Sequence, residues 1–404
     1  MKKISLALVL FVIFFDHVGF GLVYPMFSSI LFQPGSSFID PGMSSMARGC
    51  FLGLLLSVPA TTCFFSGPVM GAMSDQKGRK PLYLFSLTLA VFAYCFCMVG
   101  IFVKSIAVLI IARAITGVAI GNAAVVSATI VDLSDENNKA KNFGLYCMAS
   151  GVGFAVGPFL GGWLAAKGFI VPFLVAALAT FINLVLIFFL FKETHVVRKT
   201  TTIKVAEGIR NLKKAFKMHE LRTLFLVVVL FCFGWSLFYE FLPVLWISDY
   251  GYSMAKVGLL FAFGSLVFAL SSGLLIRPIV DRFKPHSILL YSLFIVGCFI
   301  FSSIANPPAS CIWVYLAVVN FGVALAFPTY TTLVSDSVNK NSQGEILGIL
   351  ESIQSTAFGI APLLAGLLLG IHVHMPMVLG GTSLILAALL LVRDKKKQTH
   401  LNAG

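Results

Sequence analysis

Charged residues are scarce in this chain. Asp, Glu, Lys and Arg make up 11% of its 404 residues, whereas apolar residues make up 58% and aromatic residues 13%. Apolar side chains in that proportion cannot all be buried inside one water-soluble core. They form repeated runs of about twenty residues, the length of a helix that crosses a bilayer, and without the alternation typical of barrel strands. The composition therefore predicts an all-α membrane protein.

Motifs for enzyme chemistry are also missing. The sequence contains no glycine-rich nucleotide loop, no Cys/His metal cluster and no nucleophilic triad, and His372 and His374 stand in a loop without further metal-ligand spacing. The eight cysteines fall mostly inside apolar runs, so we interpret them as small buried hydrophobic residues without disulfides. We therefore expect neither an enzyme nor a bound metal or cofactor.

Charged and turn residues divide the chain into twelve predicted membrane spans. The predicted spans cover residues 4–27, 47–71, 82–103, 105–131, 141–165, 169–191, 222–247, 255–277, 286–304, 310–334, 345–370 and 374–392. The only long polar stretch lies between the sixth and seventh spans, and we predict an amphipathic helix in it at Val205–Phe216. The predicted domains are a six-helix bundle (1–191), a basic cytoplasmic linker (192–221), a second six-helix bundle (222–394) and a cytoplasmic tail (395–404).

The positions of the basic residues predict the orientation. All but five of the 29 Lys and Arg residues lie at the termini or in the even-numbered connections. Because cytoplasmic loops are enriched in Lys and Arg, we expect both termini in the cytoplasm and a multi-pass protein of the bacterial inner membrane. The net charge of +13 is thus explained by bilayer-flanking positions, so we expect a monomer without a nucleic-acid partner. The five exceptions are Arg48, Lys104, Lys167, Lys256 and the intramembrane Arg113.

Two sequence motifs recur about half a chain length apart. The segment Asp75–Pro81 after the second span has a counterpart at Asp281–Pro285 after the eighth, and Gly157–Gly161 in the fifth span is echoed by Ala361–Gly366 in the eleventh. Similar offsets in two places indicate duplication of a six-helix unit. We therefore expect two pseudo-symmetric halves.

The segment Gly71–Pro81, with its spacing of Gly, Asp, Gly, Arg, Lys and Pro, resembles the signature loop between the second and third helices of the major facilitator superfamily. The resemblance implies the major facilitator fold of twelve helices in two bundles. It also implies a cytoplasmic latch that holds the two bundles together, with a partner acid at the end of the fourth helix; the alternative is a merely solvated charged turn. The latch residues would be Gly71, Asp75, Gly78, Arg79, Lys80, Asp132 and, in the repeat, Asp281.

Small residues in the fifth predicted span form a second motif. The run Gly153–Gly162 places glycines four residues apart, which lets another helix approach closely, and its proline bends the helix. It resembles the motif of drug:proton antiporters in the same superfamily, although small-residue stripes also occur in ordinary membrane packing. The residues of this helix-packing motif are Gly153, Gly157, Pro158, Gly161 and Gly162.

An aspartate stands in the middle of the first predicted span. The run Phe15–Pro25, which contains Asp16, resembles the acid-glycine-proline pattern of tetracycline and multidrug exporters. A charge at that depth costs roughly 2.5–3.5 kcal/mol, so burial favours the protonated form, as a reversible proton carrier requires. The alternative is a neutral acid that only bonds a neighbouring helix. Arg113, in a segment that resembles the arginine motif of the family, is expected to pair with Asp16 or, alternatively, to bond main-chain carbonyls.

Two further acids, Glu240 and Glu351, lie in apolar runs and are candidates for proton coupling or for binding a cationic substrate in a central cavity. We also consider four amides, which could line a polar cavity or bond helices together. These are Asn122, Asn183, Asn320 and Gln354. Together with the resemblance, these residues predict a proton-coupled transporter that exports small amphipathic molecules, either drugs or a native metabolite such as a siderophore. The alternatives are a proton-coupled uptake symporter and a non-transporting receptor or channel.

Overall fold

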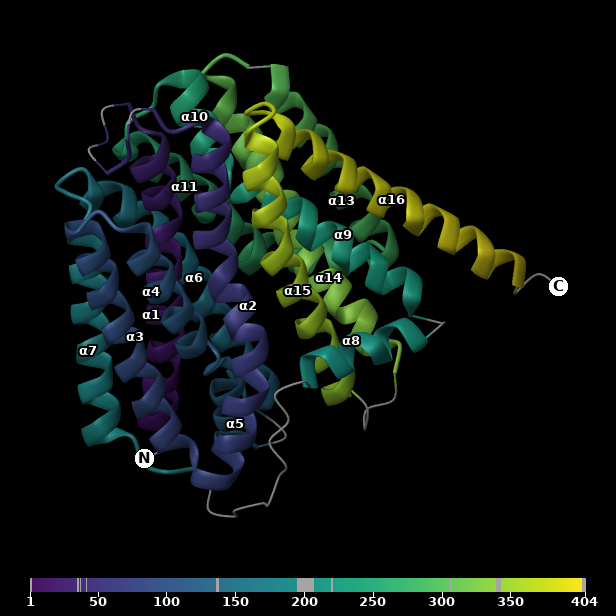
Figure 1. Ribbon diagram of the computed structural model, residues 1–404. Helices are drawn as coiled ribbons and strands as arrows, with labels where there is room; N and C mark the ends of the chain where they lie inside the picture. Colours follow the sequence, from purple (N-terminus) through teal and green to yellow (C-terminus); the bar gives the residue numbers. More distant parts are fainter. Residues whose placement is uncertain are drawn as a thin grey trace. The chain divides into compact units, whose positions relative to one another are not determined.

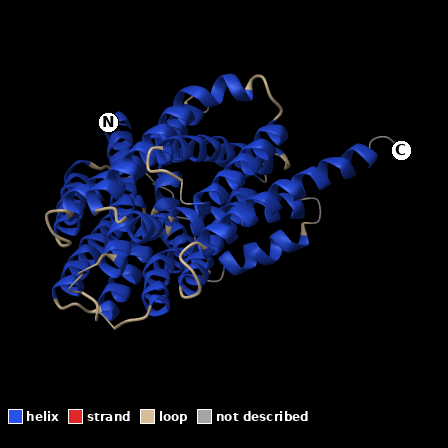
Figure 2. Cartoon of the chain, turned by 90° about the horizontal axis from the view of Figure 1, so that it is seen from above, coloured by secondary structure: helices blue, strands red, loops and turns tan. Residues whose placement is uncertain are grey.

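The computed structural model consists of helices (Figure 1). It describes residues 2–34, 36, 38–40, 42–135, 138–194, 207–218, 221–305, 307–338 and 343–401. In these ranges no strand occurs, and Figure 2 shows helices joined by short loops. Eleven described segments are long and apolar enough to cross a membrane, and α1 adds a shorter described apolar stretch, Ile4–Gly19. The prediction of an all-α membrane fold is confirmed.

The helices follow the twelve predicted spans closely. In the first half they are α1 (Lys2–Phe32), α2 (Ser45–Lys77), α3 (Arg79–Phe102), α4 (Ile106–Ile120), α5 (Ala123–Leu133), α6 (Lys139–Ala165) and α7 (Val171–Leu190). In the second half they are α9 (Arg222–Tyr239), α10 (Leu242–Tyr250), α11 (Met254–Leu270), α12 (Ile276–Val280), α13 (Pro285–Ser302), α14 (Cys311–Asp336), α15 (Gln343–Leu369) and α16 (Met375–Leu401). The fourth, seventh and eighth predicted spans each contain two α-helices, because the α-helix is interrupted within the span.

The interruptions have local causes. Between α4 and α5 the amides of Gly121 and Asn122 bond to carbonyls three residues back, which tightens the turn. Between α9 and α10, Pro243 has no amide hydrogen to continue the helical ladder. Between α11 and α12 the chain forms one π-helical turn, Ser271–Leu275. The first two interruptions each leave a polar residue, Asn122 or Glu240, at the break.

The linker contains a short helix, α8 (Glu207–Lys217), close to the predicted amphipathic segment. The beginning of that segment, Val205, lies outside the described residues, as do the basic residues Arg198, Lys199 and Lys204. The seven cysteines with described side chains are all free thiols.

The chain forms two compact units, which we describe separately. Unit 1 comprises Met1–Met43, Leu54–Glu207 and Tyr252–Ser265. In it α1 packs against α6, and α3 packs against both α4 and α7. One buried apolar cluster joins α1, α2, α3, α5 and α7, with Tyr83 and Phe191 in edge-to-face contact at 5.3 Å between ring centroids. Unit 1 contains Asp16 and both sequence motifs of the first half.

Unit 2 comprises Ser44–Gly53, Gly208–Gly251 and Leu266–Gly404. Its α9 packs against α15 and α16, and α13 packs against α14 and α16. Aromatic side chains fill much of its interior: Phe231 contacts Phe327 and Tyr330 at centroid distances of 5.0 and 5.5 Å. The boundaries predicted for the two six-helix bundles, at 191/192 and 221/222, stay a prediction.

Candidate functional site

A short chain of polar side chains crosses unit 1 at the level of Asp16. The Asn122 amide nitrogen donates to a carboxylate oxygen of Asp16 at 3.0 Å and to the hydroxyl of Ser86 at 3.2 Å. Asn122 and Ser86 are buried, with 2% and 1% of their surface exposed. The break between α4 and α5 presents the asparagine to α1 and α3 at once. Asp16, Asn122 and Ser86 form the polar relay, as we name it.

The surroundings of the polar relay are apolar or neutral. On α1, His17 bonds the carbonyl of Ile13 at 2.8 Å through Nδ1, one turn back along the same helix. Tyr94 of α3 lies directly against the backbone of Gly19, where any side chain would overlap the tyrosine hydroxyl. The side chains of Tyr24 and Pro25, also part of the sequence motif, lie outside the described residues. Among described residues, Asp16 has no ion pair.

Arg113 is not the partner of Asp16, so the predicted ion pair is wrong. Its Nε donates to the carbonyl of Leu55 at 3.0 Å, and its guanidinium lies 5.6 Å from the ring centroid of Phe27. The reason is depth in the helix: Arg113 precedes Asn122 by nine residues, roughly 13 Å along a helix axis, and Asn122 is the residue level with Asp16. The alternative prediction, a bond to a main-chain carbonyl, matches the contact.

The signature loop forms a charged cluster in unit 1. Arg79, 4% exposed, donates to Asp75 at 2.6 Å, to Asp132 at 3.0 Å and to the Ser74 hydroxyl at 2.5 Å. The structure thus brings together the three residues predicted for the latch, the acid, the arginine and the acid at the end of α5, all within unit 1; a link between the two bundles stays a prediction. A solvated turn does not bury its guanidinium in this way. Arg79 therefore joins the ends of α2, α3 and α5.

Other predicted latch residues have smaller roles or lie elsewhere. Gly71 packs against Ala124 of α5, where a Cβ would be in ordinary contact at 3.4 Å. The Lys80 ammonium lies 5.9 Å from the ring centroid of Phe188. Asp281, in unit 2, is exposed and has no hydrogen bond or ion pair to any described residue. The repeat therefore reproduces the position of the acid in the chain but not the arginine cluster.

Glu193 completes the cluster and was missed by the sequence analysis. Its carboxylate accepts from the backbone amides of Arg79 at 2.8 Å and Lys80 at 3.0 Å, which caps the first turn of α3. Gly78 makes room for it: its φ is 98°, and a Cβ there would lie 2.5 Å from a Glu193 oxygen. The only signal in the sequence is that Glu193 is among the first polar residues after an apolar run.

We expect Glu193→Ala to lower the free energy of unfolding by about 1–2 kcal/mol, because two helix N-terminal amides lose their acceptor. Thermal unfolding of the purified protein in detergent measures the change. Glu193→Gln is the matched variant: it keeps an oxygen acceptor and should recover part of the loss. Equal stability of wild type and Glu193→Ala would contradict the capping role.

The glycines of the fifth span allow α6 to pack directly against the backbone of α1. A Cβ at Gly153, Gly157 or Gly161 would lie 2.5, 2.6 or 2.5 Å from a main-chain oxygen of α1. The three oxygens belong to Phe14, Val18 and Leu22, which follow one another four residues apart along one side of α1. The packing predicted from the glycine spacing is present, and it fixes the helix that contains Asp16.

Neighbouring residues of the same motif contact other elements of unit 1. Gly162 meets Gly258 of α11, where a Cβ on Gly162 would lie 2.5 Å from the Gly258 Cα. Pro158 lies against Gly21, where a Cβ would be 2.7 Å from the proline Cδ. Helix α6 is thus held by backbone contacts on two sides.

The two other candidate acids lie in unit 2 and differ in burial. Glu240, at the break between α9 and α10, is 3% exposed and accepts from the Ser236 hydroxyl at 2.8 Å. Glu351 of α15 is exposed and has no hydrogen bond or ion pair to any described residue. One turn further along α15, Gln354 donates to the Tyr330 hydroxyl at 2.7 Å, beside the aromatic cluster of unit 2.

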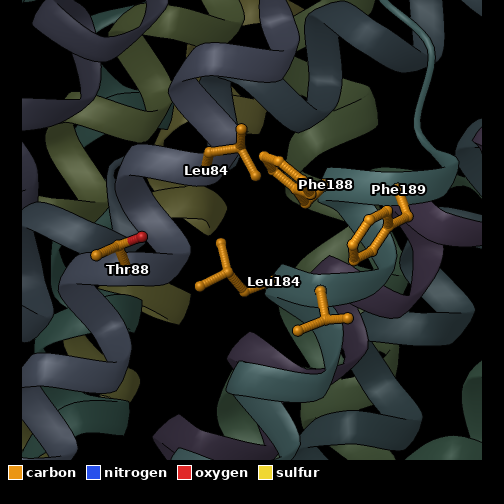
Figure 3. A pocket seen from close by; sticks show the side chains of 6 residues that line it. Leu84, Thr88, Leu184, Phe188 and Phe189 are labelled. Atoms are coloured by element: carbon orange, nitrogen blue, oxygen red, sulfur yellow. The ribbon is translucent and has the colours of Figure 1, made fainter.

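An apolar pocket of about 300 Å³ lies between α3 and α7 of unit 1, apart from the polar relay (Figure 3). Figure 3 shows Leu84 and Thr88 facing Leu184, Phe188 and Phe189 across it. The Thr88 hydroxyl is its only polar side-chain group, so the pocket offers nothing to a proton or an ion.

Comparison with known proteins identifies the family. A family model described as Major Facilitator Superfamily matches residues 6–361. The tetracycline resistance protein, class H, of Pasteurella multocida is 27% identical over 89% of this chain and 88% of its own length. The quinolone resistance protein NorA of Staphylococcus aureus is 27% identical over 96% of each chain. The structure of the human organic anion transporter MFSD10 (TETRAN) superimposes with a TM-score of 0.72 and 20% identity, covering 96% of this chain and 99% of that one.

Proposed function

Because the chain belongs to the major facilitator superfamily, a family of transporters and not of enzymes, we propose that it exports small amphipathic molecules across the bacterial plasma membrane in exchange for protons. It is a multi-pass membrane protein and a secondary active transporter. Transport of this kind needs no cofactor and draws on a proton gradient.

The single observation that supports proton exchange best is the polar relay. Asp16 lies in the middle of a membrane helix, its described hydrogen-bond partner is a neutral amide, and no described cation neutralises it. An ionised carboxylate at that depth is costly, so the group gains by taking up a proton unless water reaches it. Access of water from one side and then the other makes Asp16 a proton carrier.

Coupling to the substrate requires that Asp16 respond to movement of the helices around it. Helix α6 lies on α1 through backbone contacts at Gly153, Gly157 and Gly161, so a shift of α6 is passed directly to the helix that contains Asp16. In alternating access, such a rigid contact lets the protonated form favour one state of the transporter and the ionised form the other.

The class of substrate is supported by the relatives and by unit 2. Two relatives confer resistance to tetracycline and to quinolones, according to their names. In unit 2, the exposed Glu351 lies one helical turn before Gln354, which donates to the hydroxyl of the buried Tyr330. An exposed carboxylate in a membrane helix suits molecules that have a polar or cationic group. Drugs and a native metabolite fit this description equally.

We further propose that both termini lie in the cytoplasm and that one chain is the transport unit. The distribution of Lys and Arg supports the orientation. The relation between the two halves of the sequence supports the monomer, because both halves of a transport path are present in one chain.

Everted membrane vesicles test the direction. With an imposed gradient that is acidic inside, an exporter should accumulate tetracycline or a fluoroquinolone inside the vesicles, and a protonophore should abolish the accumulation. Vesicles from cells without the protein are the control. If the gradient instead empties preloaded vesicles, the chain is a proton-coupled uptake transporter and the proposed direction is wrong.

A further inference from the structure

The linker helix α8 is fixed beside the beginning of a membrane span in unit 2. Asn211 donates to the Ser352 hydroxyl at 3.2 Å and to the Gly348 carbonyl at 3.4 Å, and Lys214 pairs with Glu345. These three partners belong to the first turns of α15, where an apolar span begins (Figure 1). The chain enters the next span at Arg222, five residues after α8 ends. The contacts therefore hold α8 at the level of the bilayer surface.

The residues of α8 separate into three faces around the helix axis. The face toward α15 contains Asn211 and Lys214 together with the buried Gly208 and Ala215. The other two faces point away from α15, at roughly 100° per residue on a helix, and all their residues are exposed except the half-buried Leu212. One is apolar and consists of Ile209, Leu212 and Phe216, and the other is basic and consists of Arg210, Lys213 and Lys217.

The apolar face is exposed to an unusual degree for a loop helix. Phe216 is 67% exposed and Ile209 is 41% exposed, although each would gain by leaving water. An exposed apolar stripe beside a basic stripe is the arrangement of a helix that lies in a bilayer surface, with its apolar side chains among acyl chains and its cations among headgroups. The contacts with α15 place α8 at the beginning of a membrane span, which is the depth at which the bilayer surface lies.

The positive charge of the basic face indicates which class of lipid α8 binds. Three cations on one face attract an anionic headgroup, each contributing on the order of a fivefold gain in affinity near an anionic surface. A neighbouring cavity of about 650 Å³ is lined by Lys214 and Lys217, but also by Asp336 and Glu345. Its carboxylates disfavour an anion inside the cavity, so the headgroup contacts fall on the outer side of the basic face, where Lys217, at the rim of the cavity, is also exposed.

We propose that α8 is a binding surface for anionic phospholipids, in which Ile209, Leu212 and Phe216 insert among the acyl chains and Arg210, Lys213 and Lys217 bind headgroup phosphates. Lipid bound there also restrains the beginning of α15, because Asn211 and Lys214 attach α8 to that helix. Neither step depends on the proposed function, so the surface can be tested without a transport assay.

The test compares lipid binding by full-length variants in detergent, measured by native mass spectrometry with added phosphatidylglycerol or phosphatidylcholine. The variant Arg210→Gln/Lys213→Gln/Lys217→Gln removes the basic face but leaves Asn211 and Lys214 in place. We expect wild type to bind phosphatidylglycerol more tightly than phosphatidylcholine, and the variant to lose at least about tenfold of the phosphatidylglycerol affinity. Phe216→Ser should weaken the binding of both lipids.

The matched control is Arg282→Gln/Lys284→Gln/Arg393→Gln, which removes the same charge from three exposed positions of the same unit. It should leave the preference for phosphatidylglycerol intact. An equal loss in the control, or no loss in the α8 variant, would overturn the proposal. Competition by soluble glycerol phosphate at the same concentration would also overturn it, because the site would then bind a free anion and not a lipid. Unchanged thermal unfolding establishes that each variant is folded.

Discussion

Asp16→Asn is expected to reduce proton-driven accumulation of substrate in everted vesicles to the background of vesicles that lack the protein. Asparagine has the size of aspartate, and its carbonyl oxygen can still accept the bond that Asn122 donates. Asparagine cannot take up or release a proton, so the polar relay keeps its hydrogen bonds but can no longer carry a proton. Uptake of tetracycline under an imposed pH gradient measures the effect.

Two controls separate this effect from misfolding. Asp40→Asn changes an exposed acid outside any predicted span and should accumulate substrate like wild type. Exchange of labelled for unlabelled substrate needs no net movement of protons, so Asp16→Asn should retain it. Proton-driven accumulation that persists in Asp16→Asn would mean that another acid, such as Glu351, takes up the proton, and the role proposed for Asp16 would fail.

Gly157→Ala is expected to lower the free energy of unfolding by about 1–3 kcal/mol and to slow transport, because the added methyl group has nowhere to go. Its Cβ would lie 2.6 Å from the Val18 carbonyl oxygen and 2.8 Å from the Gly21 Cα, both backbone atoms of α1. Backbone cannot rotate away as a flexible side chain can, so α6 must move off α1. Thermal unfolding and transport are measured on the same preparation.

Gly151→Ala is the matched control on the same helix. No atom lies within 4 Å of the position that its Cβ would occupy, so only the intrinsic helix preference changes. That preference favours alanine by up to about 1 kcal/mol, and we expect unchanged or slightly higher stability. If both variants behave alike, contact with α1 is not what requires glycine at position 157.

The spans were predictable because the signal for them is local. An apolar run of about twenty residues between charged or turn residues specifies a membrane helix without knowledge of its neighbours, and α3, α7 and α14 begin and end close to the predicted bounds. The break at Gly121 and the π-helical turn at Ser271–Leu275 were not predicted. Both occur inside runs that are largely apolar, at the small or polar residues Gly121 and Asn122 or Ser271–Gly273, and such residues are also common inside continuous membrane helices.

The site was predictable only in part, because residue type is visible in a sequence and depth is not. The cluster of Asp75, Arg79 and Asp132 followed from a resemblance that relates the three positions to one another. The pairing of Asp16 with Arg113 did not hold, since opposite charges in two helices reveal nothing about their relative height. Asn122 was predicted either to line a polar cavity or to bond helices together, and its contacts to Asp16 and Ser86 depend on the break beside it, which the sequence analysis did not predict.

The amide of Asn122 has two hydrogens, and it uses one for Asp16 and the other for Ser86. The bond to Ser86 does not involve the carboxylate, so if Asp16 takes up a proton as proposed, we expect the asparagine to keep its orientation while the acid changes its own bonds. Ser86 on α3 and Asn122 at the start of α5 thus keep each other in place, and Asp16 on α1 is the member of the relay whose hydrogen bonds can change. Whatever rearrangement accompanies the loading of a proton should begin on that helix.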